Sequence, residues 1–162
     1  MKRISAFLII LTFTFMFCGC RAQETLNSKN QYQSDRTDSA NTRENEEMKI
    51  NILINGLSLS ASLENNETGK SFYEIIGEGI TLELAEYGGF EKVGSLGKQL
   101  PRDDKRITTK AGDLILYQGS EFSIMYGSNT WSYTKIGAID DVDKINLKTV
   151  LGNGDVIINI TK

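Results

Sequence analysis

The sequence predicts a mainly β domain, a closed or nearly closed barrel of about eight strands with two short capping helices. Apolar and polar residues alternate along most of residues 48–162, which is the period of a half-buried strand. The alternating runs are short and are separated by turns rich in glycine and asparagine. These 115 residues suit one domain, and closing so small a sheet removes its exposed edges.

The first two strands are predicted as a hairpin. Residues 49–54 (KINILI) place isoleucines on one face, and residues 57–63 (LSLSASL) place three leucines and an alanine on one face. Asn55 and Gly56 between them form a two-residue hairpin turn, because both residues tolerate positive φ.

The next segment, ENNETGKSFYEIIGEG, changes period. Its phenylalanine and isoleucines recur at i, i+3 and i+4, so we expect a helix of about ten residues. Asn65 or Asn66 can cap this helix and Gly77 can end it. Residues 80–87 return to alternation as the third strand, followed by a glycine turn.

Residues 90–112 are expected to be mostly irregular, because they are dotted with glycine and contain the only proline. Their basic side chains are interpreted as a solvated loop: Lys98, Arg102, Lys105, Arg106 and Lys110. Residues 113–127 predict two strands joined by a tight turn around Gly119 and Ser120, the first strand covered on both faces.

Residues 131–139 predict one more strand before the second helix. That helix lies within DDVDKINLKTVLGNG, with Asp141 or Asp143 as its cap and Gly152 as its stop. The alternating run DVIINI closes the domain as the last strand.

The N-terminal segment predicts export. Residues 4–17 follow Lys2 and Arg3 without a charge, and they are too short for a membrane span of about 20 apolar residues. A basic start, an apolar run and small residues behind it are typical of a signal peptide. A buried helix of a globular domain would show a polar face, which this run lacks.

The stretch Phe17-Cys18-Gly19-Cys20 resembles a bacterial lipoprotein box, whose last cysteine receives the lipid. We therefore predict a signal peptide at residues 1–19 and lipid attachment, including palmitate, at Cys20. Two or three acyl chains give a stable membrane anchor. The alternative is cleavage after Ala22, which would release a soluble secreted protein. A metal or redox pair of cysteines is disfavoured, because Cys18 leaves with the signal peptide.

Residues 20–47 predict a lipid-anchored disordered tether, since they hold one leucine, one tyrosine and no other large apolar residue beyond the cysteine. Without Lys2 and Arg3 the mature chain carries 16 basic and 21 acidic residues, a net charge of −5. This balance argues against nucleic acid as a partner. The predicted location is extracytoplasmic. If the envelope has an outer membrane, Arg21 after the lipidated cysteine favours that membrane, by resemblance to lipoprotein sorting rules.

The chain has no histidine, which excludes Ser-His-Asp and Cys-His catalysis and histidine metal sites. Asp140, Asp141 and Asp143 lack the ligand spacing of a calcium loop and are interpreted as helix caps. The glycines form no phosphate-binding motif. We predict no metal and no cofactor. Glu91 and Lys92 are interpreted either as the mouth of a groove or as a surface ion pair.

Four stretches carry a family resemblance: MKINILINGLSLSASLENNETGKSFYEII, LELAEYGGFEKVGSLGKQLP, AGDLILYQGSEFSIMYG and YTKIGAIDDVDKI. They resemble small bacterial cyclophilin-like domains, which often follow a lipoprotein signal, over nearly all of residues 48–162. The resemblance implies a cyclophilin-like closed β-barrel of eight strands with two capping helices. It implies no established activity, because that family is largely uncharacterised.

True cyclophilins are peptidyl-prolyl cis-trans isomerases that place an arginine at the prolyl nitrogen. The predicted domain has only Arg102 and Arg106, both in the charged loop, and neither matches that setting. The first hypothesis is therefore a non-catalytic binding or accessory module for a peptide, an envelope protein or a small ligand. The alternative is a divergent prolyl isomerase or folding helper, which an arginine beside an aromatic groove would favour. Another enzyme would need a pair of acids in a deep pocket.

Aromatic residues gather in the middle of the domain. Core packing is one explanation for them. If some of them face a groove on the barrel wall, they could bind a ligand. The candidates are Phe90, Tyr126, Trp131 and Tyr133.

Overall fold

The structure is a computed structural model that describes residues 47–162. The predicted signal peptide, the lipid-attachment site Cys20 and all of the tether but Glu47 lie outside the described residues. The strands are β1 (Lys49–Ile54), β2 (Leu57–Leu63), β3 (Ile80–Tyr87), β4 (Glu91–Ser95), β5 (Lys105–Thr108), β6 (Asp113–Tyr117), β7 (Glu121–Met125), β8 (Thr130–Ile139) and β9 (Val156–Thr161). The helices are α1 (Glu67–Ile76), the 3-10 turn η1 (Val142–Lys144) and α2 (Leu147–Leu151).

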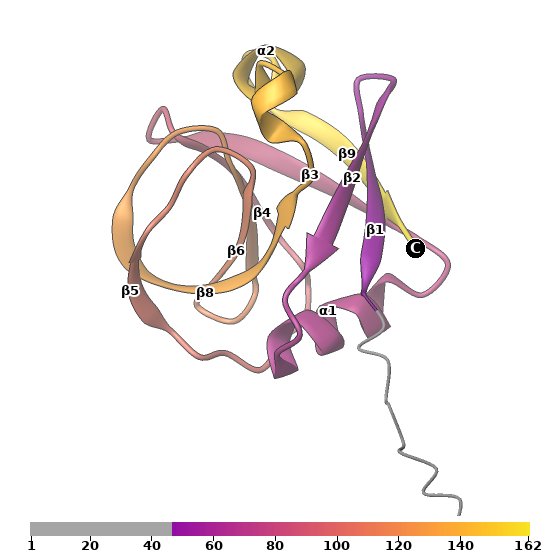
Figure 1. The fold of residues 1–162 in the computed structure, drawn as a ribbon, viewed down its shortest axis with the longest axis vertical. Helices are drawn as coiled ribbons and strands as arrows, with labels where there is room; N and C mark the ends of the chain where they lie inside the picture. The colour runs from indigo at the N-terminus through magenta and orange to yellow at the C-terminus, as the bar shows by residue number, and fades with distance from the viewer. Residues whose placement is uncertain (1–46) are drawn as a thin grey trace, which may run out of the picture. The chain divides into compact units, whose positions relative to one another are not determined.

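Eight strands close into a barrel (Figure 1). Their order is β2-β1-β9-β3-β4-β7-β6-β8, and β8 pairs back with β2 through Gly137–Ile139. Every pairing is antiparallel. β5 stands outside this ring and pairs with residues 130–133 of β8. The predicted fold class, a mainly β closed barrel of about eight strands with two helices, is confirmed.

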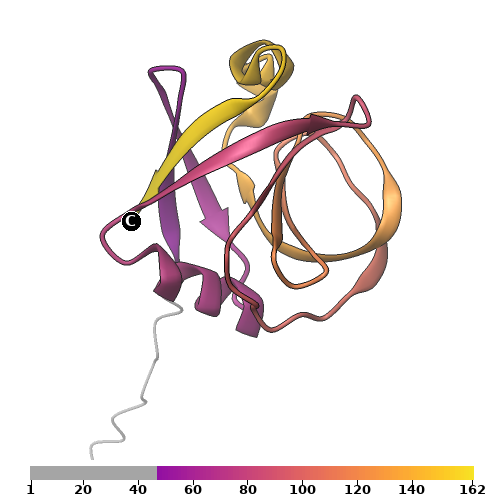
Figure 2. The same cartoon turned by 180° about the vertical axis from the view of Figure 1, so that it is seen from behind.

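One apolar core fills the barrel, because alternate side chains of each strand point inward. Both helices contribute to this core: α1 adds Phe72 and Ile76, and α2 adds Leu147 and Leu151. The Phe72 ring stacks on Phe122 of β7 with a centroid distance of 5.2 Å. The helices lie at opposite ends of the barrel in both views (Figures 1 and 2), so each covers one end of the core. Neither is long and apolar enough to cross a bilayer, a statement that covers residues 47–162.

The predicted hairpin is confirmed. Asn55 has φ 49° and Gly56 has φ 82°, and the turn brings Ile54 opposite Leu57. Such a pair of positive φ angles twists the chain in the sense that the flanking strands need. Leu57 was expected to face inward, but it is 42% exposed because it sits at the tip of the hairpin.

The expectation of an irregular segment at residues 90–112 is wrong, because β4 and β5 lie within it. β4 shows no apolar alternation, since Glu91 and Lys92 are charged and yet both buried. Its glycine is required by packing: a Cβ on Gly94 would lie 2.2 Å from the Glu83 carbonyl oxygen of β3. β5 is a four-residue strand with a single apolar side chain, which leaves too little pattern to recognise.

Both predicted caps hold for the first helix, whereas for the second helix only the predicted C-terminal stop holds. Asn66 accepts a hydrogen bond from the Gly69 N–H, and α1 ends at Gly77 as expected. The cap of α2 is Asn146, which accepts from the Thr149 N–H, and not Asp141 or Asp143. The two aspartates precede and enter the 3-10 turn η1, which splits the expected helix. Gly152 ends α2 as predicted.

Candidate functional site

Two adjacent residues of β4 point to opposite sides of the barrel wall. Lys92 pairs with Ile124 of β7, a member of the barrel core, so its side chain faces inward. Glu91 pairs with Tyr87 of β3 and with Met125 of β7, which belongs to a separate apolar cluster. Because side chains alternate along a strand, Glu91 faces the outside of the barrel. The expectation that Glu91 and Lys92 form a surface ion pair is therefore wrong.

A hollow of about 620 Å³ lies on this outer wall. Its aromatic lining comes from three separate stretches of the chain: Tyr87 and Phe90, then Tyr117, then Trp131 and Tyr133. The charged residues that line it are both acidic, Glu91 and Glu121. Of the described residues, no lysine or arginine lines the hollow. It has the size and apolar character of a ligand pocket, with a small number of polar groups.

The hollow is built over a second, small apolar cluster outside the barrel. Ile115, Met125 and Tyr133 are buried there, and Phe90, Ile107 and Tyr117 pack against them. This cluster explains why β6 is apolar on both faces, as the sequence predicts. Three of its members, Phe90, Tyr117 and Tyr133, also line the hollow, so the cluster holds the lining in place.

The aromatic side chains are oriented by one another and by amides. The rings of Tyr117 and Tyr133 meet edge to face at 6.0 Å, and those of Tyr87 and Phe90 do so at 6.1 Å. Asn129 Nδ2 donates to the Tyr133 hydroxyl at 2.8 Å, and Gln118 Nε2 donates to the Tyr117 hydroxyl at 3.0 Å. By contrast, Tyr87 and Trp131 are 61% and 52% exposed, so a ligand can reach their ring faces.

Glu91 is the buried charged group of the hollow. The residue is only 6% exposed, and it forms no ion pair with any described residue. Burial raises the pKa of its carboxyl group, and the neighbouring Ser123 hydroxyl offsets part of that rise. The Ser123 Oγ makes no well-formed hydrogen bond within residues 47–162. The outer wall therefore buries a carboxyl group that has no counterion.

Lys92, on the other face of β4, differs from Glu91 because its charge is paired. Lys92 is 0% exposed, and its ammonium lies 2.6 Å from Glu86 Oε2 and also donates to the Gly154 carbonyl oxygen. The Tyr126 hydroxyl donates to Glu86 Oε1. The hydrogen bond from Lys92, followed by that from Tyr126, lowers the pKa of Glu86. Burial, then the hydrogen bond to Glu86, raises the pKa of Tyr126 to about 12.

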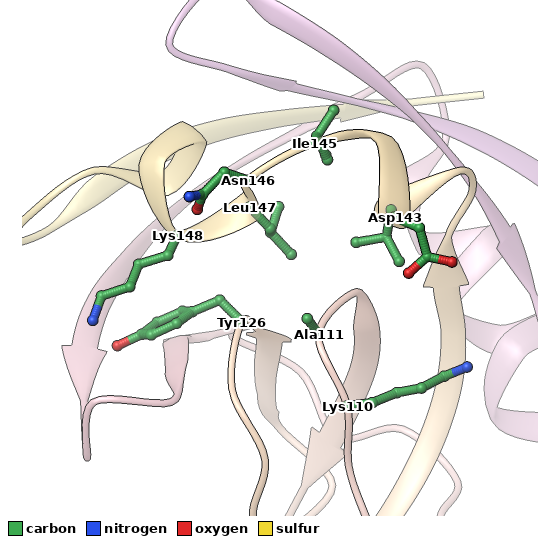
Figure 3. Close-up of a pocket in the computed structure, with 9 residues that line it drawn as sticks. Lys110, Ala111, Tyr126, Asp143, Ile145, Asn146, Leu147 and Lys148 are labelled. Carbon is green, nitrogen blue, oxygen red and sulfur yellow. The ribbon is translucent and has the colours of Figure 1, made fainter.

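The structure brings together Phe90, Trp131 and Tyr133 of the four predicted ligand-binding residues and places Tyr126 elsewhere. Tyr126 lines a second hollow of about 550 Å³ at the end of the barrel near α2 (Figure 3). There its ring lies beside Lys148, whose ammonium is 5.8 Å from the ring centroid. Tyr126 follows the outward Met125 and therefore turns inward, which the two-residue alternation of β7 could have predicted.

The acidic residues of the hollow were not among the predicted site residues. The sequence-based prediction treats Glu91 only together with its neighbour Lys92 and assigns no role to Glu121. A strand assignment for β4 would have separated the two neighbours onto opposite faces.

The basic residues that were expected to be solvated are all exposed: Lys98, Arg102, Lys105, Arg106 and Lys110. Within residues 47–162, no three His, Cys, Asp or Glu side chains are grouped so that they could hold a metal ion.

Comparisons with known proteins identify the family of the chain. A search of curated proteins and a search of solved structures both found no match to the chain. The family model described as the Cyclophilin-like family matches residues 52–161, which is more than half of the chain and covers nearly all of the described barrel. The chain therefore belongs to the cyclophilin-like family.

Proposed function

We propose that this protein is a lipid-anchored, extracytoplasmic binding module of a bacterial envelope. It binds a peptide, a segment of an envelope protein or a small ligand without catalysing a reaction on it. The observation that carries the proposal is the hollow on the outer barrel wall, with five aromatic side chains and a buried acid. Concave, mostly apolar surfaces with a small number of polar groups are typical of ligand sites.

The polar groups of the hollow support binding over prolyl isomerisation. Rotation about a peptide bond has a barrier of about 20 kcal/mol, and lowering it requires a donor placed at the prolyl nitrogen. The two arginines of the described region lie elsewhere. The Nε atom of Arg102 lies 3.5 Å from Asp104, and Arg106 is in register with Ser132, so it faces away from Trp131. Prolyl isomerisation remains the alternative activity, because aromatic side chains on this wall would also suit a proline ring.

The binding part of the proposal is tested with the full chain in detergent and a set of peptides that contain Xaa-Pro bonds. Trp131 is the only tryptophan, so its fluorescence reports occupancy of the hollow. Two-dimensional exchange NMR on the peptide signals measures cis-trans interconversion in the same samples. We expect fluorescence changes in a subset of peptides and unchanged exchange rates. Accelerated exchange would replace the binding module with the isomerase.

The anchoring part rests on Cys20 and on the tether of residues 20–47. A coil of that length spans on the order of 30 Å, which would hold a domain clear of lipid head groups. Cells are grown with labelled palmitate, and membranes are separated from soluble protein. We expect Cys20→Ser to abolish labelling and to release the chain into the soluble fraction. Cys18→Ser is the matched control and should stay labelled. Label retained in Cys20→Ser would refute this anchor.

A further inference from the structure

The charged side chains that line the outer hollow are negative, and no positive side chain of the described residues balances them. Glu91 and Glu121 line it, and no described basic side chain does. Two basic strand residues are in register with members of the outer cluster, Lys105 with Tyr133 and Lys135 with Ile115, but their ammonium groups lie 2.6 Å from Asp103 and 3.0 Å from Asp113. A carboxylate as buried as Glu91 normally has an ion-pair partner, because removing it from water without one is costly. No described residue supplies such a partner.

The aromatic lining favours an organic cation over a hydrated metal ion. The face of an aromatic ring carries negative electrostatic potential and attracts ammonium groups, most strongly for tryptophan and tyrosine. Four of the five aromatic side chains of the hollow are of these two types. The exposed rings of Tyr87 and Trp131 can cover an alkyl chain, while Glu91 receives the charge at its end.

We infer that the hollow binds the side chain of a lysine in a peptide, with its ammonium group at Glu91 and its alkyl stem along the aromatic rings. This inference rests on the proposed binding function and names its ligand. A lysine fits better than an arginine, because a compact ammonium on a slender stem can reach a carboxyl group with only 6% exposure. A planar guanidinium needs a wider approach to make its paired hydrogen bonds.

The test uses a pentapeptide with blocked ends and a central lysine between leucine and alanine residues, so that the lysine carries its only charge. The same peptide with acetylated lysine is the neutral control. Binding to the full chain in detergent is measured by calorimetry and by Trp131 fluorescence. Three variants are compared with the unaltered chain: Glu91→Gln, Glu121→Gln and Glu83→Gln. Glu83 is an exposed glutamate of β3 that does not line the hollow, so it serves as the matched control.

We expect acetylation of the lysine to weaken binding at least tenfold, and Glu91→Gln to weaken binding of the lysine peptide by a similar factor. Glu121→Gln should have a smaller effect, and Glu83→Gln none. Equal binding of the two peptides would refute the cation and leave the binding function standing. Binding of butylammonium chloride without either peptide would replace the peptide by a free amine. If no peptide of this or the Xaa-Pro set binds, both the inference and the proposed peptide-binding function fail.

Discussion

Glu91 and Lys92 are neighbours on one strand, and they meet opposite electrostatic surroundings. On the inner side, Lys92 is fully buried and is paired with Glu86 and with a backbone carbonyl. On the outer side, Glu91 is nearly as buried and has no ion pair among residues 47–162. Lys92, Glu86 and Tyr126 pair with one another within the fold, whereas the proposed ligand would supply the cation that Glu91 lacks.

This comparison separates a structural role from a binding role. A buried charge that has partners is stabilised in the folded state. Removing one partner leaves the other charge buried and uncompensated, which lowers the free energy of unfolding. A buried charge without partners lowers stability in the free protein, and sites that carry such a cost are often functional. The two sides of β4 should therefore respond in opposite ways to neutral substitutions and to pH.

The largest expected effect is on the inner side. Glu86→Gln removes the charge that compensates Lys92, and urea unfolding should show a loss of about 2 kcal/mol. This is less than for a fully buried pair, because 38% of the Glu86 side chain is exposed and water screens its charge. Glu83→Gln on the same strand should change the unfolding free energy by less than about 0.5 kcal/mol.

Combining Glu86→Gln with Lys92→Met sharpens this test. Without the ammonium, no uncompensated charge remains inside the barrel, so the double variant should recover most of the stability lost in Glu86→Gln. The opposite result is a double variant whose unfolding free energy is lower than that of Glu86→Gln by about as much again. It would show that Lys92 stabilises the barrel through its contact with Gly154 and not through Glu86.

The next effect is a pair of opposite pH profiles. Hydrogen bonds lower the pKa of Glu86, so its stabilisation is present above about pH 4.5, its usual pKa, and is lost as the pH falls through the lowered value. Burial raises the pKa of Glu91, so this carboxyl group destabilises the fold as the pH rises from about 4.5 through the raised value. Urea unfolding between pH 3 and pH 8 measures both.

We expect Glu91→Gln to be more stable than the unaltered protein at pH 8, with the difference disappearing toward pH 4.5. The deficit of Glu86→Gln should instead persist down to about pH 4.5 and shrink below it. Parallel profiles for the two variants would contradict the assignment of Glu91 as a buried, unpaired carboxyl group.

A smaller effect is expected from Tyr126→Phe. This change removes the hydroxyl that donates to Glu86 and should cost about 1 kcal/mol of unfolding free energy. Tyr73→Phe, at another half-buried tyrosine, is the control. Because Tyr126 does not line the outer hollow, binding of a ligand there should be unchanged. Weakened binding in Tyr126→Phe would show that the two sides of the wall are coupled.

The smallest stability effect belongs to the outer rim. Trp131→Ala removes a side chain that is 52% exposed, so unfolding should shift by less than about 1 kcal/mol, while calorimetry should show a large loss of ligand affinity. Ile157→Ala on β9 removes another exposed apolar side chain, 61% exposed, and should affect neither quantity strongly. Unchanged affinity in Trp131→Ala would remove this tryptophan from the binding surface.

Much of the barrel could be predicted from local pattern. The Asn55-Gly56 turn, the helix capped by Asn66 and the alternating strands β1, β2, β3 and β9 all follow from two-residue or helical periodicity in the sequence. β4 could not be predicted in this way, because its buried residues are charged and its glycine is required by a contact with β3. A search for alternating apolar residues does not detect a strand whose buried residues are charged.

The grouping of the aromatic residues could be predicted only in part, because the sequence pattern does not show which side chains share a surface. The sequence places aromatic residues in the middle of the domain, and three of the four predicted binding residues share the hollow. The fourth, Tyr126, lies with Glu86 because it comes one residue beyond β7 and turns away from the side on which Met125 lies. Which residues share a surface depends on strand register, and register is settled by pairing between distant segments.

The sequence by itself determined the mainly β class through its two-residue periodicity. It also determined the first hairpin, the first helix and its caps, because these three features depend on contacts within a few residues. Only the tertiary structure decided that the buried Lys92 has Glu86 and Gly154 as partners while Glu91 lies among aromatic rings on the outer wall. The reason is physical: the free energy of a buried charge depends on partners that are brought near by closure of the whole barrel. No local pattern contains that information.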